Sequence, residues 1–252
     1  MTADPLAPLL ELPGVAEASD RAREALGRAH RHRANLRGWP VTAAEAALRA
    51  ARASSVLDGG PVRLEDLADA AQITDPVFGG ALRVAQALEG GSGPLIGIWQ
   101  RAPLQALARL HVLAAADQVG EDRLGRPRSD PEIGPRLELI ADLVTGGTQV
   151  PAPVIAAVAH GDLLTLKPFG SADGVVARAV SRLVTISSGL DPHGLGVPEV
   201  SWMRQPAQYR DTATAFGDGT PAGVGAWVVM CCRAMRAGAQ EALSIAESVP
   251  RR

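Results

Sequence analysis

The chain has 252 residues, of which 46% are hydrophobic and 21% are charged, and its formal net charge is −2. A chain of this length buries enough apolar surface to fold without a disulfide or a metal, and its charge argues against a protein that coats nucleic acid. No apolar run reaches the roughly 18–20 residues of a membrane span, and the first residues lack the basic-then-apolar order of a secretory signal. We therefore expect a cytoplasmic protein that binds neither nucleic acid nor a membrane.

The composition favours an all-α fold. Aromatic residues make up only 3% of the chain, so Ala, Leu and Val must fill the core, and Ala is a strong helix former. Periodicity and breaker residues predict helices over 14–36, 41–56, 64–71, 76–88, 103–119, 131–144, 151–166, 175–188, 206–216 and 221–248. The run 95–99 is the best extended segment, so we expect at most a short β-hairpin flap there.

The chain shows no repeat of fixed period and no long Pro/Ser linker, which indicates a single domain. We expect an N-terminal helical extension over 1–40, a core over 41–200, and C-terminal helices over 201–252 that pack on the core. Thr42 with Glu45 three residues later reads as a capping box, which predicts that a helix begins there.

The break between the two central predicted helices is the best candidate for a binding site. Asp173 stands where an N-cap belongs, and the small residues Ser171 and Gly174 let a ligand approach the backbone. The free N–H groups of a helix N-terminus bind anions, and Arg178 and Lys167 add positive charge at the same mouth. These residues are compatible with a phosphate ligand and also with a plain helix–turn–helix connection, and the residues of the break alone leave both interpretations open.

The segment 153–182 resembles the core of the Fic (Fido) family. In that family a helix carries Ala-His, a His-Pro-Phe follows seven residues later, and a loop Asp-Gly-Asn-Gly-Arg leads to a second Arg three residues on. Here Ala159-His160 takes the upstream position, and Lys167-Pro168-Phe169 follows at the same offset. The loop over 170–175 reads Gly-Ser-Ala-Asp-Gly-Val, and Arg178 takes the place of the second Arg.

A second stretch, Ser54-Ser55-Val56-Leu57-Asp58-Gly59, resembles the family's inhibitory signature Ser-x-x-x-Glu-Gly with Asp58 for Glu. In self-inhibited members that Glu pairs with the second Arg of the loop and blocks the terminal phosphate of the nucleotide. The resemblance therefore implies that Asp58 and Arg178 face each other across one cleft, in contact or separated by a single water. Asp is shorter than Glu by one methylene, which reduces its reach by roughly 1.3–1.5 Å.

The resemblance implies an all-α, Fic-like helical bundle whose active members transfer AMP from ATP onto a protein hydroxyl. In such members the central His is the general base, the acidic loop residue holds Mg²⁺, and loop amides with two arginines hold the phosphates. The positions that match the phosphate-binding and nucleotide-binding part of the loop are Phe169, Gly170, Ser171, Asp173, Gly174 and Arg178, and the inhibitory positions are Ser54, Asp58 and Gly59.

Three chemical parts of the family motif are replaced. Lys167, the only lysine in a composition typical of bacterial genomes rich in G and C, stands at the base position. An ordinary lysine has a pKa of about 10.4 and is protonated at neutral pH. Ser171, a poor Mg²⁺ ligand, stands at the acidic position, and Val175 replaces the first arginine. Asp173 replaces the family's Asn, where a carboxylate either ligates a metal from a shifted position or repels phosphate.

Three hypotheses remain open from the residues. The first is a Fic-fold protein that lacks standard adenylylation and binds a nucleotide or phosphate. The second is a divergent nucleotidyl or phosphoryl transferase that uses Lys167 and Asp173, with ATP or another nucleotide and Mg²⁺. The third is a protein-interaction module. The sequence contains no metal-ligand spacing, and it fixes neither the nucleotide, nor a protein partner, nor the oligomeric state.

Overall fold

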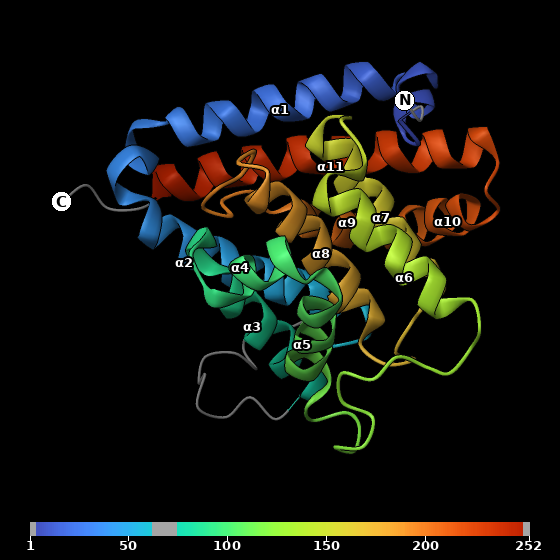
Figure 1. Ribbon diagram of the computed structural model, residues 1–252. Coiled ribbons are helices and arrows are strands. Elements are labelled where there is room, and N and C mark those ends of the chain that lie inside the picture. The colour runs from blue at the N-terminus through green and yellow to red at the C-terminus, as the bar shows by residue number, and fades with distance from the viewer. Residues whose placement is uncertain (1–3, 62–74, 249–252) are drawn as a thin grey trace.

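The computed structural model describes residues 4–61 and 75–248, and within those ranges every regular element is helical (Figure 1). The all-α expectation is therefore confirmed. The elements in chain order are η1 (Ala7–Glu11), α1 (Val15–Arg31), α2 (Arg33–Leu57), α3 (Pro76–Leu88), η4 (Glu89–Gly91), α4 (Pro94–Arg101), α5 (Pro103–Ala115), α6 (Ile133–Asp142), η5 (Leu143–Gly147), α7 (Ala152–Leu166), α8 (Asp173–Ser187), α9 (Pro198–Arg204), α10 (Pro206–Gly217) and α11 (Pro221–Ser248).

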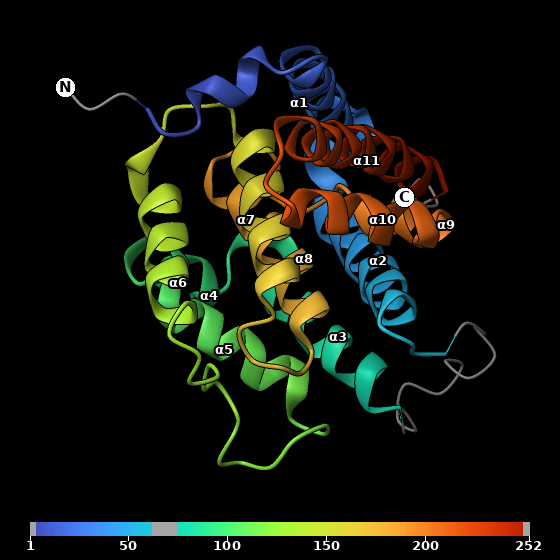
Figure 2. The same cartoon turned by 90° about the vertical axis from the view of Figure 1, so that its right-hand side faces the viewer.

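Helix α8 lies at the centre of the bundle, because every residue from Val175 to Ile186 is buried. It packs against α7, α3 and α5, and also against α2 and α4 (Figure 2). A helix that is buried all round must be surrounded by other elements. Helices α1 and α11 lie alongside each other, and α11 also contacts α7 and α2 (Figure 1). The start of α8, where the candidate site lies, is therefore fixed by several neighbours.

The expected extended segment 95–99 is wrong, because these residues belong to α4. Pro94 occupies the first helical turn, where it needs no hydrogen-bonded N–H. Leu95, Ile96 and Trp99 are buried on one side, at helical spacing. A short apolar run alone does not distinguish a strand from a buried helix. Here the burial of these side chains at helical spacing stabilises the helix.

The expected start of the second helix at Thr42 is also wrong. Helix α2 begins after the extended residue His32 and continues through Pro40. The Thr42 hydroxyl donates to Asn35 Oδ1 at 2.9 Å and caps nothing, and Glu45 lies in the helix interior. The predicted helix 14–36 is therefore split at His32, and its last residues join α2.

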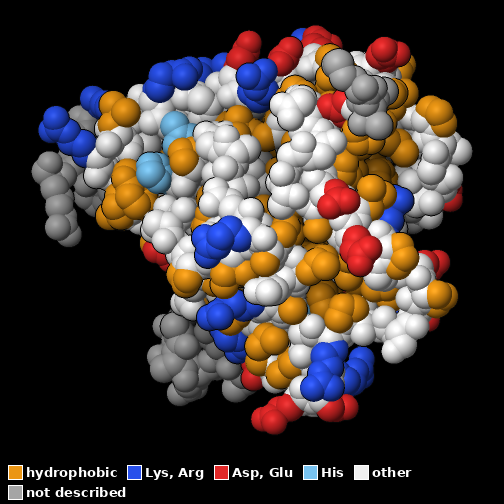
Figure 3. All heavy atoms as spheres, viewed as in Figure 1, with side chains coloured by type: hydrophobic (Ala, Val, Ile, Leu, Met, Phe, Trp, Pro, Cys, Tyr) orange, Lys and Arg blue, Asp and Glu red, His pale blue; other side chains and the backbone are white. Residues whose placement is uncertain are grey.

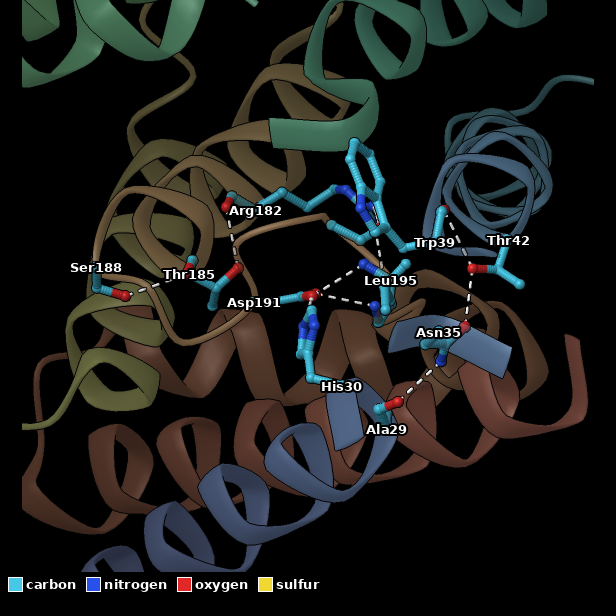
Figure 4. Close-up of polar contacts among 12 residues, drawn as sticks. Ala29, His30, Asn35, Trp39, Thr42, Arg182, Thr185, Ser188, Asp191 and Leu195 are labelled. Carbon is cyan, nitrogen blue, oxygen red and sulfur yellow. Dashed lines mark hydrogen bonds and ion pairs between the residues drawn. The ribbon is translucent and has the colours of Figure 1, made fainter. Parts of the chain in front are cut away.

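The loop between α8 and α9 ties α1 to the core. The buried Asp191 carboxylate accepts hydrogen bonds from His30 Nε2 at 2.7 Å and from the backbone N–H groups of Leu195 and Gly196 at 2.9 Å (Figure 4). Burial alone would raise the pKa of Asp191, but these hydrogen bonds hold it below its usual value. Histidine side chains reach the surface beneath α1 on the face that Figure 3 shows. A single carboxylate thus organises the loop and holds the N-terminal helix.

The structure differs from the predicted elements at two further places, and one predicted helix lies outside the described residues. The predicted helix 64–71 lies outside the described residues, α5 ends at Ala115 rather than at residue 119, and α9 was not predicted. None of the helices in the described residues combines the length and the apolar character that crossing a membrane requires.

Candidate anion site at the turn between α7 and α8

The turn between α7 and α8 contains two residues in the left-handed region. Lys167 ends α7 with φ 48° and Ala172 precedes α8 with φ 50°, and neither is glycine. Left-handed backbone costs roughly 1–2 kcal/mol for a residue with a Cβ. The surroundings of the turn must therefore hold it in this shape.

Asp173 holds the turn from inside. Its Oδ1 accepts a hydrogen bond from the Phe169 backbone N–H at 2.9 Å, so the side chain points back along the chain. The expectation that Asp173 is the N-cap is wrong, since Ala172 occupies that position and Asp173 is the first residue of α8. Burial raises the pKa of Asp173 to about 6, although the N–H groups of Phe169 and Gly170 favour the charged form. The Asp173 carboxylate therefore accepts its hydrogen bonds from backbone N–H groups of its own turn.

Ser171 is held by a histidine from α5. His111 Nε2 lies 3.0 Å from Ser171 Oγ, and its Nδ1 accepts from the Gly125 N–H at 2.9 Å. Because Nδ1 accepts, the neutral ring carries its proton on Nε2 and donates it to Ser171. His111 thus cannot take a proton from Ser171, and the pair is not a nucleophile with its base. The ring stacks on Phe169 with centroids 4.2 Å apart, and burial lowers the pKa of His111.

Arg128, from the loop before α6, covers the outer side of the turn. Its Nε donates to Lys167 O at 3.0 Å and its Nη2 donates to Leu166 O at 3.2 Å. Its backbone N–H donates to Pro168 O at 2.7 Å. These bonds satisfy carbonyls that the end of α7 leaves free, and a cation suits the negative end of a helix. A Cβ on Gly170 would lie 3.1 Å from Arg128 Cδ, so the arginine stem rests on that glycine.

Asp58 and Arg178 are in direct contact, as the two resembling motifs predict. Asp58 Oδ1 lies 2.9 Å from Arg178 Nη2, and the side chains are 23% and 1% exposed. Arg178 also donates through Nε to Ser54 Oγ at 2.8 Å and through Nη2 to Ser54 O at 3.0 Å. Burial disfavours the arginine's charge, but Asp58 and Tyr209 outweigh it and raise the pKa of Arg178. The end of α2 therefore clamps the arginine of α8.

The Asp58 carboxylate also lies against the first turn of α8. A Cβ on Gly174 would be 2.4 Å from Asp58 Oδ1 and 2.6 Å from Oδ2, closer than any side chain permits. Only glycine leaves room for this approach. The N-terminal turn of a helix is where the macrodipole and the free N–H groups favour an anion. The Asp58 carboxylate is thus the anion that lies at the start of α8. Gly59, at φ 91°, then turns the chain away from α2.

Tyr209 and His160 extend this polar cluster into the core. The Tyr209 hydroxyl accepts from Arg178 Nη1 at 3.4 Å, so it donates its own proton to His160 Nε2 at 2.8 Å. His160 is fully buried, and burial together with the Arg178 charge holds its pKa well below the usual value. The histidine is therefore neutral and structural, and His160 Nδ1 has no hydrogen-bond partner among the described residues.

Lys167 and Val175 stand at two of the positions where the resembling motif is replaced. Lys167 is exposed, so the burial that a lysine general base requires is missing. Val175 is 2% exposed and packs in the core. The sequence singled out neither His111, Arg128 nor Tyr209 as a site residue, because each meets its partners from a distant part of the chain.

Among known proteins, this chain resembles solved structures only. No family model matches the sequence, and no curated protein matches it. The structure is similar to a Fic family protein from Desulfovibrio desulfuricans G20, with a TM-score of 0.77, 17% identity, and coverage of 94% of this chain and 76% of the other. It is also similar to residues 134–508 of Fic-1 from C. elegans, with a TM-score of 0.71, 14% identity, and coverage of 94% and 74%. This chain has the Fic fold.

Proposed function

We propose that this protein binds the phosphate group of a nucleotide at the turn between α7 and α8, and that it does not carry out standard adenylyl transfer. The observation that carries the proposal is the position of Asp58. Its carboxylate neutralises Arg178 at 2.9 Å and lies against Gly174 in the first turn of α8. A phosphate must displace this internal anion, so Asp58 keeps the site closed.

The residues around the turn argue against transfer chemistry. The exposed Lys167 is no general base, and Ser171 is already hydrogen-bonded to His111. The Asp173 carboxylate accepts from the backbone of its own turn and is not presented to a ligand. These groups do not fit Mg²⁺, which prefers carboxylate oxygens that are free to coordinate it. The same observations count against a divergent transferase that uses Lys167 and Asp173.

The test is a thermal shift assay with ATP, ADP and GTP, each with and without Mg²⁺, on the wild type and on Asp58→Ala. A ligand that binds only the folded state raises the melting temperature, and tenfold tighter binding adds about 1.4 kcal/mol of stabilisation when the ligand is in excess. We expect a larger shift in Asp58→Ala than in the wild type, since Arg178 and the α8 N-terminus then lack their internal anion.

Two further variants test whether a change in the ligand-induced thermal shift is specific to the charge of Asp58. Asp20→Ala removes an exposed carboxylate that pairs with Arg23 on α1, and its shifts should equal those of the wild type. Asp58→Asn removes the charge but keeps the size, in case Asp58→Ala does not fold. Equal shifts in wild type and both Asp58 variants would contradict the role of Asp58. No shift in any protein would favour an interaction module, and a shift in the wild type that requires Mg²⁺ would favour the transferase.

A further inference from the structure

A cavity of about 360 Å³ lies among the three last helices, away from the turn between α7 and α8. Helices α9 and α10 follow each other along α11 (Figures 1 and 2). Residues of all three helices line the cavity. Its volume falls in the range of about 300–1,000 Å³ that is usual for small-molecule sites. It is lined by Ser201, Trp202, Gln205, Gln208, Tyr209, Thr212, Ala226, Val229, Met230, Arg233 and Ala234.

The cavity follows from the local sequence. Gln205 has φ −133° and ψ 59°, which interrupts the helix, and Pro206 restarts it as α10. This break separates α9 from α10, and both helices contact α11. On α11 the lining residues recur at spacings of three and four, which places them on one face. Two of them, Ala226 and Ala234, are too small to fill the space between the three helices.

The lining is apolar at the floor and polar at the rim. Trp202, Tyr209 and Ala234 are buried, whereas Gln205, Gln208 and Arg233 are exposed. Arg233 forms no ion pair with any described residue, and among the described lining residues it is the sole charged group. The side chains of Gln205 and Gln208 likewise make no hydrogen bond to the described chain, so amide donors and acceptors are available at the mouth.

This cavity is separate from the Asp58–Arg178 site. The side of Tyr209 forms part of its floor, but the Tyr209 hydroxyl is already engaged with Arg178 and His160. None of the residues 167–174 lines it.

We propose that the cavity binds a small aromatic carboxylate. The flat body of such a ligand packs against Trp202 and the Met230 thioether, which makes favourable contacts with aromatic rings. Its carboxylate meets Arg233 at the rim, where a single cation with no opposing acid favours one negative charge. Gln205 and Gln208 supply hydrogen bonds around it. The binding of this ligand does not depend on the nucleotide site proposed above.

The test uses naphthoate and its neutral analogue naphthamide as probes, with affinities measured by isothermal titration calorimetry. We expect the wild type to bind naphthoate about two- to fivefold more tightly than naphthamide, the factor that an ion pair at an exposed rim provides. Arg233→Gln should abolish that preference. Arg236→Gln removes an exposed arginine of the same helix that does not line the cavity, and it should preserve the preference.

A variant at the mouth of the cavity tests whether the two probes bind inside it. Ala226 is exposed at the rim, so Ala226→Phe blocks the mouth without disturbing the core, and it should weaken both probes more than about tenfold. Equal wild-type affinities for the two probes, or unchanged affinities in Ala226→Phe, would overturn the proposal. Tighter naphthoate binding in Asp58→Ala would also overturn it, because the anion would then sit at Arg178. The nucleotide assay reads out the other site, so either proposal can fail alone.

Discussion

Replacing Asp173 by Asn isolates the energetic cost of a carboxylate inside the α7–α8 turn. Asp173 is 8% exposed, and its Oδ1 accepts from the Phe169 N–H at 2.9 Å. Burial raises its pKa from 3.8 to about 6, in spite of the hydrogen bonds from the Phe169 and Gly170 backbone. An Asn amide oxygen accepts the same hydrogen bond without a charge, so the variant keeps the turn and removes the buried anion.

Proton binding to Asp173 determines the direction in which its contribution to the free energy of unfolding changes with pH. Between pH 3.8 and about pH 6 the folded state holds a proton on Asp173 that the unfolded state has lost. The stability from this proton is fully present below the unfolded pKa and is lost as the pH rises through the folded pKa. A difference of about two pKa units corresponds to about 3 kcal/mol, which solvent contact reduces to about 2–3 kcal/mol. At neutral pH the variant should therefore be more stable than the wild type by that amount, and near pH 4 the difference should fall to about 0.5 kcal/mol.

The assay is urea unfolding followed by far-UV circular dichroism, at about pH 4 and about pH 7.5. His111, His160 and His193 have lowered pKa values, so their contribution rises with pH, opposite in sign to that of Asp173. The wild-type profile alone mixes these effects, and the difference between wild type and variant removes the histidines. The matched control Asp211→Asn changes an exposed carboxylate and should shift stability by no more than about 0.5 kcal/mol. A wild-type-minus-variant difference that does not change with pH would refute the reasoning.

Three further outcomes are expected. Ala172→Gly should raise the unfolding free energy by about 0.5–1 kcal/mol in urea, because glycine adopts the left-handed φ of 50° without a Cβ penalty. Tyr209→Phe should lower it by about 1–3 kcal/mol, because Arg178 loses an acceptor and His160 loses its donor. With α-labelled ATP and Mg²⁺, the purified protein should label neither itself nor lysate proteins, and labelling that disappears in Lys167→Ala would establish the transferase.

The predictions from sequence succeeded where the determining signal is local or belongs to a motif. The apolar periodicity and the Lys-Pro-Phe-Gly break predict the bounds of α7 and α8. The observed bounds agree with the predicted ones within two residues. The pairing of Asp58 with Arg178 joins positions 120 residues apart, and only the two motifs together predicted it. Helix α2 shows the limit, because the capping-box signal of Thr42 and Glu45 predicted a helix start that the tertiary packing overrides.

The residues that hold the turn, and the tyrosine of the buried cluster around Arg178, were not predictable, because their signals are not local. His111 is 60 positions from Ser171, and nothing around it in the sequence marks it as the partner of a loop serine. Arg128 belongs to an arginine-rich loop, where its neighbours look the same. Tyr209, the only tyrosine, lies 49 positions from His160. A hydrogen bond between distant side chains depends on the tertiary arrangement, which periodicity does not encode.

The geometry of the Asp58–Arg178 pair indicates how the site opens. Arg178 is 1% exposed and keeps its bonds to Ser54 and Tyr209 when Asp58 leaves, so it stays in place at the start of α8. Asp58 is 23% exposed at the end of α2, so a rotation of its side chain alone would free Arg178, whereas moving α2 itself would break both bonds from Arg178 to Ser54. In the function that we propose, a phosphate displaces this one carboxylate and meets an arginine that is already oriented, and the absence of a side chain on Gly174 leaves space beside it.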